Sequence, residues 1–251
     1  MTTVSTGKQN PLAAAEAADK RRKIAIQIGV AGVLVALVAA IGVGIAVNRS
    51  DDDSSGSSSV AQLPATGGSV TETGTVRIGD PNAKVKVRVV ADLQCPACKQ
   101  FEAANGEALA KAAADGTAVV EYQVISFLDK ASTNQYSSRA ANASFCVAKS
   151  DPSKYQTWLQ TMFAKQPAEG GAGLSNEQLV QIATEVGYTD PAVATCINDK
   201  PYNDYITQVT QQTLSSGVES TPSVFINGQL NQTDAIFTKD GLASVIADAA
   251  K

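Results

Sequence analysis

Polar and apolar residues alternate between positions 84 and 91, which predicts a β-strand, and residues 99–114 have the apolar spacing of an amphipathic helix. Between these two stretches stand Cys95 and Cys98, separated by two residues. Residues 119–128 predict a second strand. The order strand, helix, strand favours a β-α-β unit with a right-handed crossover.

The next block, residues 130–216, shows helical spacing throughout and includes a capping-box pattern at 175–178. A strand pattern returns at 220–229, where Asn227 followed by glycine is a strong hairpin signal. An amphipathic helix over 239–249 closes the chain. We therefore expect an α/β fold whose two halves are separated by a helical insertion.

The N-terminal part of the chain has a different pattern. Residues 1–23 are polar and end in four basic residues, and residues 24–47 are apolar except for Gln27. As a helix, this run would reach about 36 Å, which exceeds a hydrocarbon core of about 30 Å. The positive-inside rule predicts a cytoplasmic tail at 1–23, a transmembrane anchor at 24–47 and an extracytoplasmic remainder. Residues 48–74, rich in Ser, Gly and Asp, predict a flexible linker to a domain at 75–251.

A cleaved signal peptide is the main alternative to this anchor. Its apolar region is normally only about 7 to 15 residues long, and the small residues that would suit cleavage lie in the middle of this run. A buried core helix fits less well, because no polar face interrupts the apolar run.

The distribution of charge along the chain indicates which kinds of macromolecule it can bind. The chain has a net charge of −4, although residues 1–23 carry five basic and two acidic residues. The remainder is therefore acidic, which argues against nucleic acid as a partner.

Cys95 and Cys98 are the candidate catalytic residues. Pro96 suits the first turn of the predicted helix, because the missing N–H of proline costs nothing there. Cys95 would then lie at the helix N-terminus, where free N–H groups and the helix dipole stabilise a thiolate. Such a dithiol can attack or accept disulfides. Half of a zinc site and a structural disulfide are the alternatives, but the chain has no His and no second C-x-x-C. We expect neither a metal nor a cofactor.

These motifs resemble those of the DsbA family of thioredoxin-fold disulfide oxidoreductases. The likeness rests on the Cys-Pro-Ala-Cys motif at 95–98 with Asp-Leu-Gln before it, the helical insertion, and the sequence Thr-Pro-Ser-Val-Phe-Ile-Asn-Gly at 221–228. It covers roughly residues 75–251. The resemblance implies a thioredoxin-like fold with a helical insertion domain at 130–216.

The resemblance also implies roles for single residues. Cys95 would form the mixed disulfide with a substrate, and Cys98 would be the shielded, resolving thiol. The bond before Pro222 would be cis and face Cys95, and Thr221 would offer backbone groups to a bound peptide.

Two positions depart from the family pattern. Ala97 stands where many members carry a His that donates to the thiolate, and Val89 stands where well-studied members have a buried acid. Pro96 and Ala97 would therefore tune the site without that His. We consider Asp92 and Glu121 as replacement proton acceptors for Cys98; the alternative for each is a solvated or salt-bridged carboxylate.

The other two cysteines, Cys146 and Cys196, lie among apolar residues of the insertion. Outside the cytoplasm, an even number of cysteines favours pairing. We therefore predict a structural disulfide between them.

Together these features predict a membrane-tethered oxidoreductase that introduces disulfides into exported proteins with free cysteines. The family implies reoxidation by a quinone-linked membrane partner of the DsbB or vitamin K epoxide reductase type. A disulfide isomerase or a reductase remains open, as does a non-catalytic thioredoxin-like binding protein.

Overall fold

The computed structural model describes residues 70, 71 and 73–251. The predicted tail at 1–23, the predicted anchor at 24–47 and the predicted linker up to residue 69 lie outside these residues. Within residues 70, 71 and 73–251, no helix is both long enough and apolar enough to span a bilayer.

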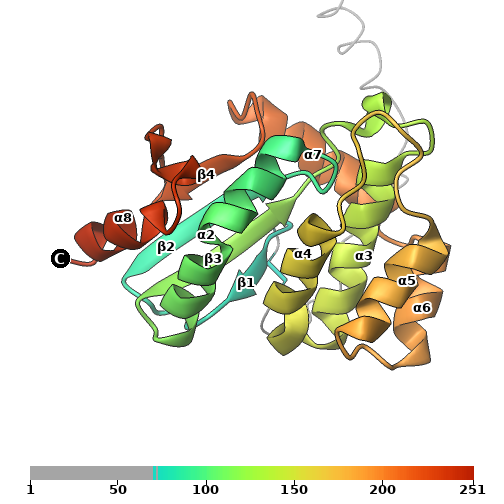
Figure 1. The fold of residues 1–251 in the computed structure, drawn as a ribbon, viewed down its shortest axis with the longest axis horizontal. Coiled ribbons are helices and arrows are strands. Elements are labelled where there is room, and N and C mark those ends of the chain that lie inside the picture. The colour runs from blue at the N-terminus through green and yellow to red at the C-terminus, as the bar shows by residue number, and fades with distance from the viewer. Residues whose placement is uncertain (1–69, 72) are drawn as a thin grey trace, which may run out of the picture. The chain divides into compact units, whose positions relative to one another are not determined.

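A five-stranded mixed sheet forms the centre of the domain (Figure 1). The strand order is β1-β3-β2-β4-β5; β2 and β3 run parallel, and the other neighbours are antiparallel. The strands are β1 (Val76–Ile78), β2 (Val85–Ala91), β3 (Ala118–Val124), β4 (Ser223–Ile226) and β5 (Gln229–Leu230). The β2-α2-β3 unit and the β4-β5 hairpin confirm the predicted pattern, although β3 ends four residues before the predicted strand.

Two helices pack on one face of this sheet, and most of the insertion lies beyond the β1 edge, whereas its last helix lies near the start of α2 (Figure 1). The two helices are α2 (Pro96–Ala114) and α8 (Gly241–Ala249). The insertion contains α3 (Tyr136–Ser150), α4 (Tyr155–Ala164), α5 (Asn176–Glu185), α6 (Pro191–Asp199) and α7 (Asn203–Ser215). The predicted helical insertion is therefore confirmed, and the capping box that begins α5 is present at Ser175 and Gln178.

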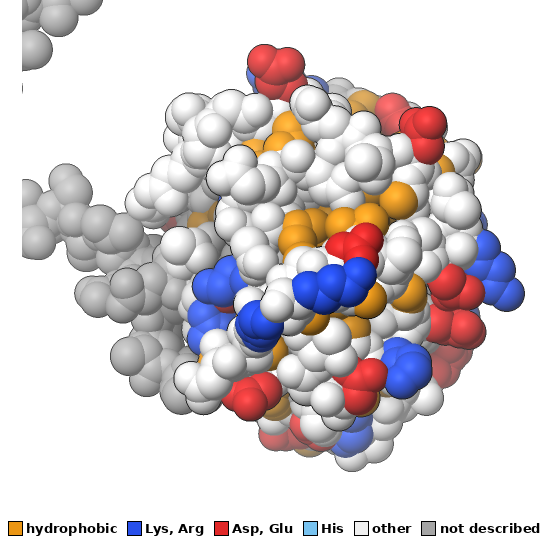
Figure 2. Space-filling view, turned by 90° about the vertical axis from the view of Figure 1, so that its left-hand side faces the viewer, with side chains coloured by type: hydrophobic (Ala, Val, Ile, Leu, Met, Phe, Trp, Pro, Cys, Tyr) orange, Lys and Arg blue, Asp and Glu red, His pale blue; other side chains and the backbone are white. Residues whose placement is uncertain are grey.

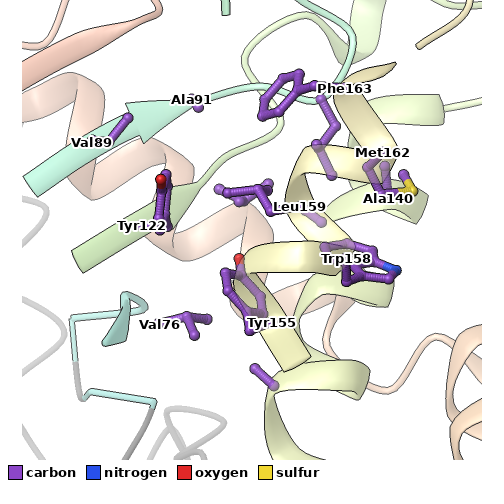
Figure 3. Close-up of a cluster of buried hydrophobic side chains, with 14 of the residues drawn as sticks. Val76, Val89, Ala91, Tyr122, Ala140, Tyr155, Trp158, Leu159, Met162 and Phe163 are labelled. Atoms are coloured by element: carbon purple, nitrogen blue, oxygen red, sulfur yellow. The ribbon is translucent and has the colours of Figure 1, made fainter. Parts of the chain in front are cut away.

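The insertion joins the sheet through a shared hydrophobic core (Figure 3). Helix α4 presents its apolar stripe to side chains of β1, β2 and β3. Tyr155 and Leu159 are fully buried there and point toward Tyr122 of β3, whereas the buried Trp158 points away from the strands, toward Ala140 of α3. Burial of this size stabilises each large side chain by roughly 1.5–3 kcal/mol, so the insertion and the thioredoxin-like half fold against one another.

The opposite face of β2 and β3 carries several polar side chains, together with the buried Val90 and Val119. Lys86 is exposed and Arg88 is half-buried, whereas Val85, Val87 and Val89 between them are buried. This alternation explains the basic residues of β2, because successive side chains of a strand point to opposite faces. Seen from the left-hand side of Figure 1, charged side chains of both signs surround small hydrophobic patches (Figure 2).

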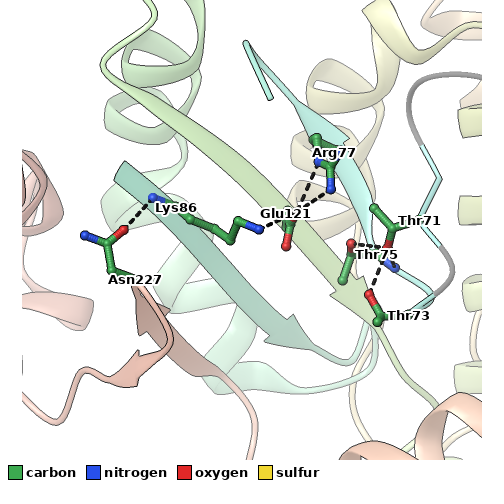
Figure 4. A network of polar contacts seen from close by, with 7 residues as sticks. All are labelled: Thr71, Thr73, Thr75, Arg77, Lys86, Glu121 and Asn227. Atoms are coloured by element: carbon green, nitrogen blue, oxygen red, sulfur yellow. Dashed lines mark hydrogen bonds and ion pairs between the residues drawn. The ribbon is translucent and has the colours of Figure 1, made fainter. Parts of the chain in front are cut away.

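The folded domain begins earlier than the sequence predicted. Val70 forms a bridge with Val76, and the N–H of Gly74 donates to the carbonyl of Thr71. The hydroxyl groups of Thr71 and Thr75 lie 2.7 Å apart beside β1 (Figure 4). The predicted linker boundary at residue 74 is therefore wrong, because backbone pairing with β1 orders the end of that segment.

Candidate active site

Strand β2 delivers the cysteine pair to the N-terminus of α2. After Ala91 the chain turns, and the N–H of Cys95 donates to the carbonyl of Asp92 at 3.0 Å. Cys95 is the N-cap residue with extended dihedrals, and Pro96 is the first residue of the helix. Pro96 is exposed and Ala97 half-buried. The sequence predicted this local arrangement because proline favours the first helical position.

The two thiols are free but lie in different surroundings. Cys95 retains 7% exposure, whereas Cys98 has none. A hydrogen bond from the Cys98 thiol is the largest cause that lowers the pKa of Cys95 to about 6, and the N–H groups of Cys98 and Ala97 contribute to this shift against the effect of burial. Burial raises the pKa of Cys98, and the hydrogen bond and charge of Cys95 add to that shift. The pair thus combines a reactive thiolate with a shielded thiol.

The loop before β4 lies against Cys95. The Thr221–Pro222 peptide bond is cis. The Cys95 thiol donates to the Thr221 carbonyl, with 3.3 Å between Sγ and O. The buried Thr221 hydroxyl has no hydrogen-bond partner among the described residues in this thiol form. Its interaction with the thiolate lowers the pKa of Cys95. The fold therefore brings together residues 95–98 and 221–222, which the sequence placed at one site.

The Asp92 carboxylate, one of the two candidate proton acceptors, holds the loop before Cys95. Its oxygens accept hydrogen bonds from the N–H groups of Gln94 and Leu128, both at 2.8 Å, and from the Ser137 hydroxyl, also at 2.8 Å. Burial is the main cause that raises its pKa to about 6, and the charge of Cys95 adds to this shift. All three bonds of the carboxylate go to the loop and its neighbours, so Asp92 anchors the site and acts on Cys95 through charge.

Glu121, the other candidate acceptor, points toward Arg77 and Lys86 (Figure 4). Its Oε1 lies 2.9 Å from Nη2 of Arg77 and 3.6 Å from Nζ of Lys86. Its neighbour Tyr122 faces α4, so Glu121 points to the opposite side of the sheet. The prediction that Glu121 accepts the proton of Cys98 is wrong; the salt-bridged alternative describes it.

The sequence analysis missed a buried acid in α2. Glu102 stands four residues after Cys98 and is 5% exposed. Burial raises its pKa to about 7. Gln156 donates to its Oε1 at 3.2 Å, whereas its Oε2 has no hydrogen-bond partner within the described residues. A Cβ at Gly106 would lie only 2.5 Å from Oε1, so the glycine makes room for this carboxyl.

A sequence signal for Glu102 existed. It lies on the stripe that contains Cys98, Asn105 and Leu109, all of which are fully buried. A carboxyl on the buried stripe of a helix is rare, because burial disfavours its charged form. Glu102 also lines a groove of about 230 Å³ between α2 and α4.

The remaining cysteines are joined away from this site. Cys146 of α3 and Cys196 of α6 form a disulfide with an S–S distance of 2.03 Å. The Asn142 amide donates to the carbonyl of Cys196 at 3.2 Å beside it. The predicted pairing is thus present, and it joins two helices of the insertion. Among the residues that the structure describes, no cluster of three or more His, Cys, Asp or Glu could hold a metal ion.

Known proteins resemble this domain in fold and, at up to about a third identity, in sequence. The profile of the family described as "Thioredoxin" matches residues 71–247. The reduced form of DsbA from Mycobacterium tuberculosis is 30% identical, with a TM-score of 0.58, over 70% of this chain and 99% of that chain. DsbG from the same organism is 29% identical, with a TM-score of 0.59, over 70% and 92% of the two chains. BdbD from Bacillus subtilis, at 20% identity and a TM-score of 0.61, supports the fold alone.

A curated relative matches part of the chain. The serine/threonine-protein kinase PknE of Mycobacterium tuberculosis is 32% identical over 127 residues, which is 49% of this chain. The match spans only 22% of the length of that kinase.

Proposed function

Because the chain belongs to the thioredoxin family and is a DsbA-like thiol–disulfide oxidoreductase, we propose that it introduces disulfide bonds into exported proteins. The observation that supports this direction of exchange is the contrast between its two thiols. The pKa of Cys95 is lowered to about 6, and that of Cys98 is raised. A stabilised Cys95 thiolate favours the reduced enzyme, so the oxidised enzyme readily gives up its disulfide.

The proposed exchange proceeds in two steps. A substrate thiolate attacks Sγ of Cys95, the Cys95–Cys98 bond breaks, and Cys98 leaves with the electron pair and takes up a proton. A second substrate thiolate then attacks the substrate sulfur of the mixed disulfide and releases Cys95 as a thiolate. Two electrons pass from the substrate dithiol to the enzyme, and the substrate keeps the new disulfide.

In many members of the family, a His between the two cysteines donates a hydrogen bond to the thiolate of the first cysteine. Here Ala97 occupies that position; the Cys98 thiol is the main donor to the thiolate, and the Thr221 hydroxyl and the N–H groups of Cys98 and Ala97 add to the stabilisation. Thr221 therefore has two roles in the proposal: its hydroxyl stabilises the leaving thiolate, and its backbone receives an extended substrate peptide.

The reduction potential of the full chain, measured against glutathione buffers, tests the proposal. We expect a value close to that of DsbA, about −120 mV, rather than that of thioredoxin, about −270 mV. A value near that of thioredoxin would contradict the oxidase and favour a reductase.

Activity assays distinguish the proposed oxidase from an isomerase and from a non-catalytic binding protein. An isomerase would reshuffle a scrambled disulfide protein faster than it oxidises a reduced one. A non-catalytic binding protein would keep its partner affinity after Cys95→Ser, whereas the proposed enzyme loses all turnover.

We further propose that residues 24–47 anchor the enzyme in the cell membrane with its N-terminus in the cytoplasm. The basic residues before this run and the three Asp residues after it support that orientation. Protease treatment of intact spheroplasts should then digest the catalytic domain and spare the tail.

A quinone-linked membrane protein of the DsbB or vitamin K epoxide reductase type would reoxidise the enzyme. Membranes depleted of quinone should accordingly leave it reduced.

A further inference from the structure

The segment between α4 and α5 holds the backbone of the active-site loop. Gln166, two residues after α4 ends, donates through Nε2 to the carbonyl of Leu93 and to the carbonyl of Cys95, both at 3.0 Å. An amide nitrogen has two hydrogens, so both donors of this side chain are used on the main chain of the loop.

The same loop is held at a second point. Gln94, between the two carbonyls, donates to the carbonyl of Leu128 at 2.8 Å and to the Ser137 hydroxyl at 3.2 Å. Its Oε1 accepts from the N–H of Gly170 at 3.4 Å. Among the hydrogen bonds of the described insertion residues, the one from Gln166 reaches the backbone of the reactive cysteine itself.

The Cys95 carbonyl is the first acceptor of α2. It receives the N–H of Lys99 at 3.2 Å, which closes the first helical turn. The N–H groups of Ala97 and Cys98, which stabilise the Cys95 thiolate, belong to that turn. Since Cys95 is the N-cap and makes no side-chain cap, no capping side chain fixes this end of α2. A second hydrogen bond to the Cys95 carbonyl therefore sets the orientation of the turn relative to the sulfur.

We propose that Gln166 is a positioning residue for thiol–disulfide exchange. Its amide holds the carbonyls of Leu93 and Cys95 so that the N–H groups of the first helical turn stay directed at Sγ of Cys95. The insertion thereby takes part in setting the reactivity of a cysteine that belongs to the thioredoxin-like half. This inference rests on exchange at Cys95 and is independent of whether the enzyme oxidises or reduces its substrates.

Gln166→Met tests the proposal in the full chain. Methionine keeps the length of the side chain and removes both donors. We expect the pH midpoint of Cys95 ionisation, followed by thiolate absorbance at 240 nm, to rise by about half to one unit, the size of one lost hydrogen bond. The equilibrium constant for oxidation of reduced glutathione by the enzyme should fall about three- to tenfold. Gln181→Met, which removes an exposed bond to Glu185 on α5, serves as the matched control and should leave both values unchanged.

A lower melting temperature with an unchanged Cys95 midpoint would overturn the proposal, because Gln166 would then be only structural. If the variant does not fold, hydrogen exchange of the side-chain amides in the unmodified protein decides the question. We expect the Gln166 amide to exchange more slowly than the exposed Gln181 amide. Equal exchange rates would show that the two bonds do not form in solution and would also overturn the proposal.

Discussion

The two cysteine pairs of this domain differ in bonding state and in position within their helices. Cys95 and Cys98 are free and begin a helix beside the Thr221 carbonyl. Cys146 and Cys196, 50 residues apart in the chain, are joined between two helices of the insertion. The first pair lies where helix N–H groups stabilise a thiolate, so its disulfide can open and close. The second pair lies within helices α3 and α6, away from such a terminus, and holds the insertion together.

The largest expected effect on oxidation activity comes from substitutions in the Cys95–Cys98 pair. Cys95→Ser should abolish oxidation of a reduced substrate protein, because Cys98, the other free thiol of the site, is fully buried and cannot form the enzyme disulfide alone. Cys98→Ala should instead accumulate a mixed disulfide between Cys95 and the substrate, visible on non-reducing gels. Residual turnover in Cys95→Ser would show that the assignment of the attacking sulfur is wrong.

The second pair should affect stability rather than chemistry. Replacing both Cys146 and Cys196 by Ser opens a 50-residue loop, and the chain-entropy model gives a loss of about 4 kcal/mol in the free energy of unfolding. Urea titration measures this loss. The Cys95 midpoint should stay the same in the folded variant. A large shift of that midpoint would mean that the two pairs are coupled.

The pH dependence of stability should also distinguish the redox forms. The pKa of Cys95 falls from 9.0 to about 6 in the folded reduced protein, so the folded state loses its proton at a lower pH than the unfolded state. The reduced form therefore gains stability as pH rises from about 6 to 9, and this contribution is lost as pH falls through about 6. The oxidised form has no Cys95 thiol and lacks this gain.

Unfolding of both forms by urea across that range isolates the contribution of Cys95. Glu102, whose raised pKa makes stability fall between about 4.5 and 7, is present in both forms, so its effect cancels in the difference. Equal pH dependence in the two forms would contradict the lowered pKa of Cys95.

The smallest expected effect concerns the loop before β4. Thr221→Val removes the hydroxyl but keeps the branched shape and the carbonyl that contacts Cys95. The pKa of Cys95 should rise by less than about one unit, because one hydrogen bond to the thiolate is lost. Thr221→Ser keeps the hydroxyl and serves as the control. Absorbance titration of both variants is the measurement, and equal midpoints would exclude a role for the hydroxyl.

Much of the site was open to prediction from sequence because its determinants are local. The position of Cys95 at a helix start follows from the strand pattern before it and from Pro96 after it. The pairing of Cys146 with Cys196 followed from their number and surroundings. The start of the domain was placed too late, because a polar segment without periodicity gives no sign that Val70 pairs with Val76.

The identity of the acids near the cysteines could not be read from the sequence. Asp92 follows the first predicted strand and Glu121 lies within the second. In the structure, Asp92 holds the active-site loop, whereas Glu121 pairs with Arg77 on the far side of the sheet. Glu102 was passed over, although it is the buried acid on the helix that carries Cys98.

The sequence by itself thus determined the order of elements, the chemistry of the cysteine pair and the family, since periodicity, capping and short motifs act within a few residues. Only the tertiary structure decided which distant groups surround Cys95. Thr221 lies 126 positions and Gln166 lies 71 positions from that residue. Contacts over such separations depend on how strands and helices pack against each other, and neither periodicity nor local propensity carries that information.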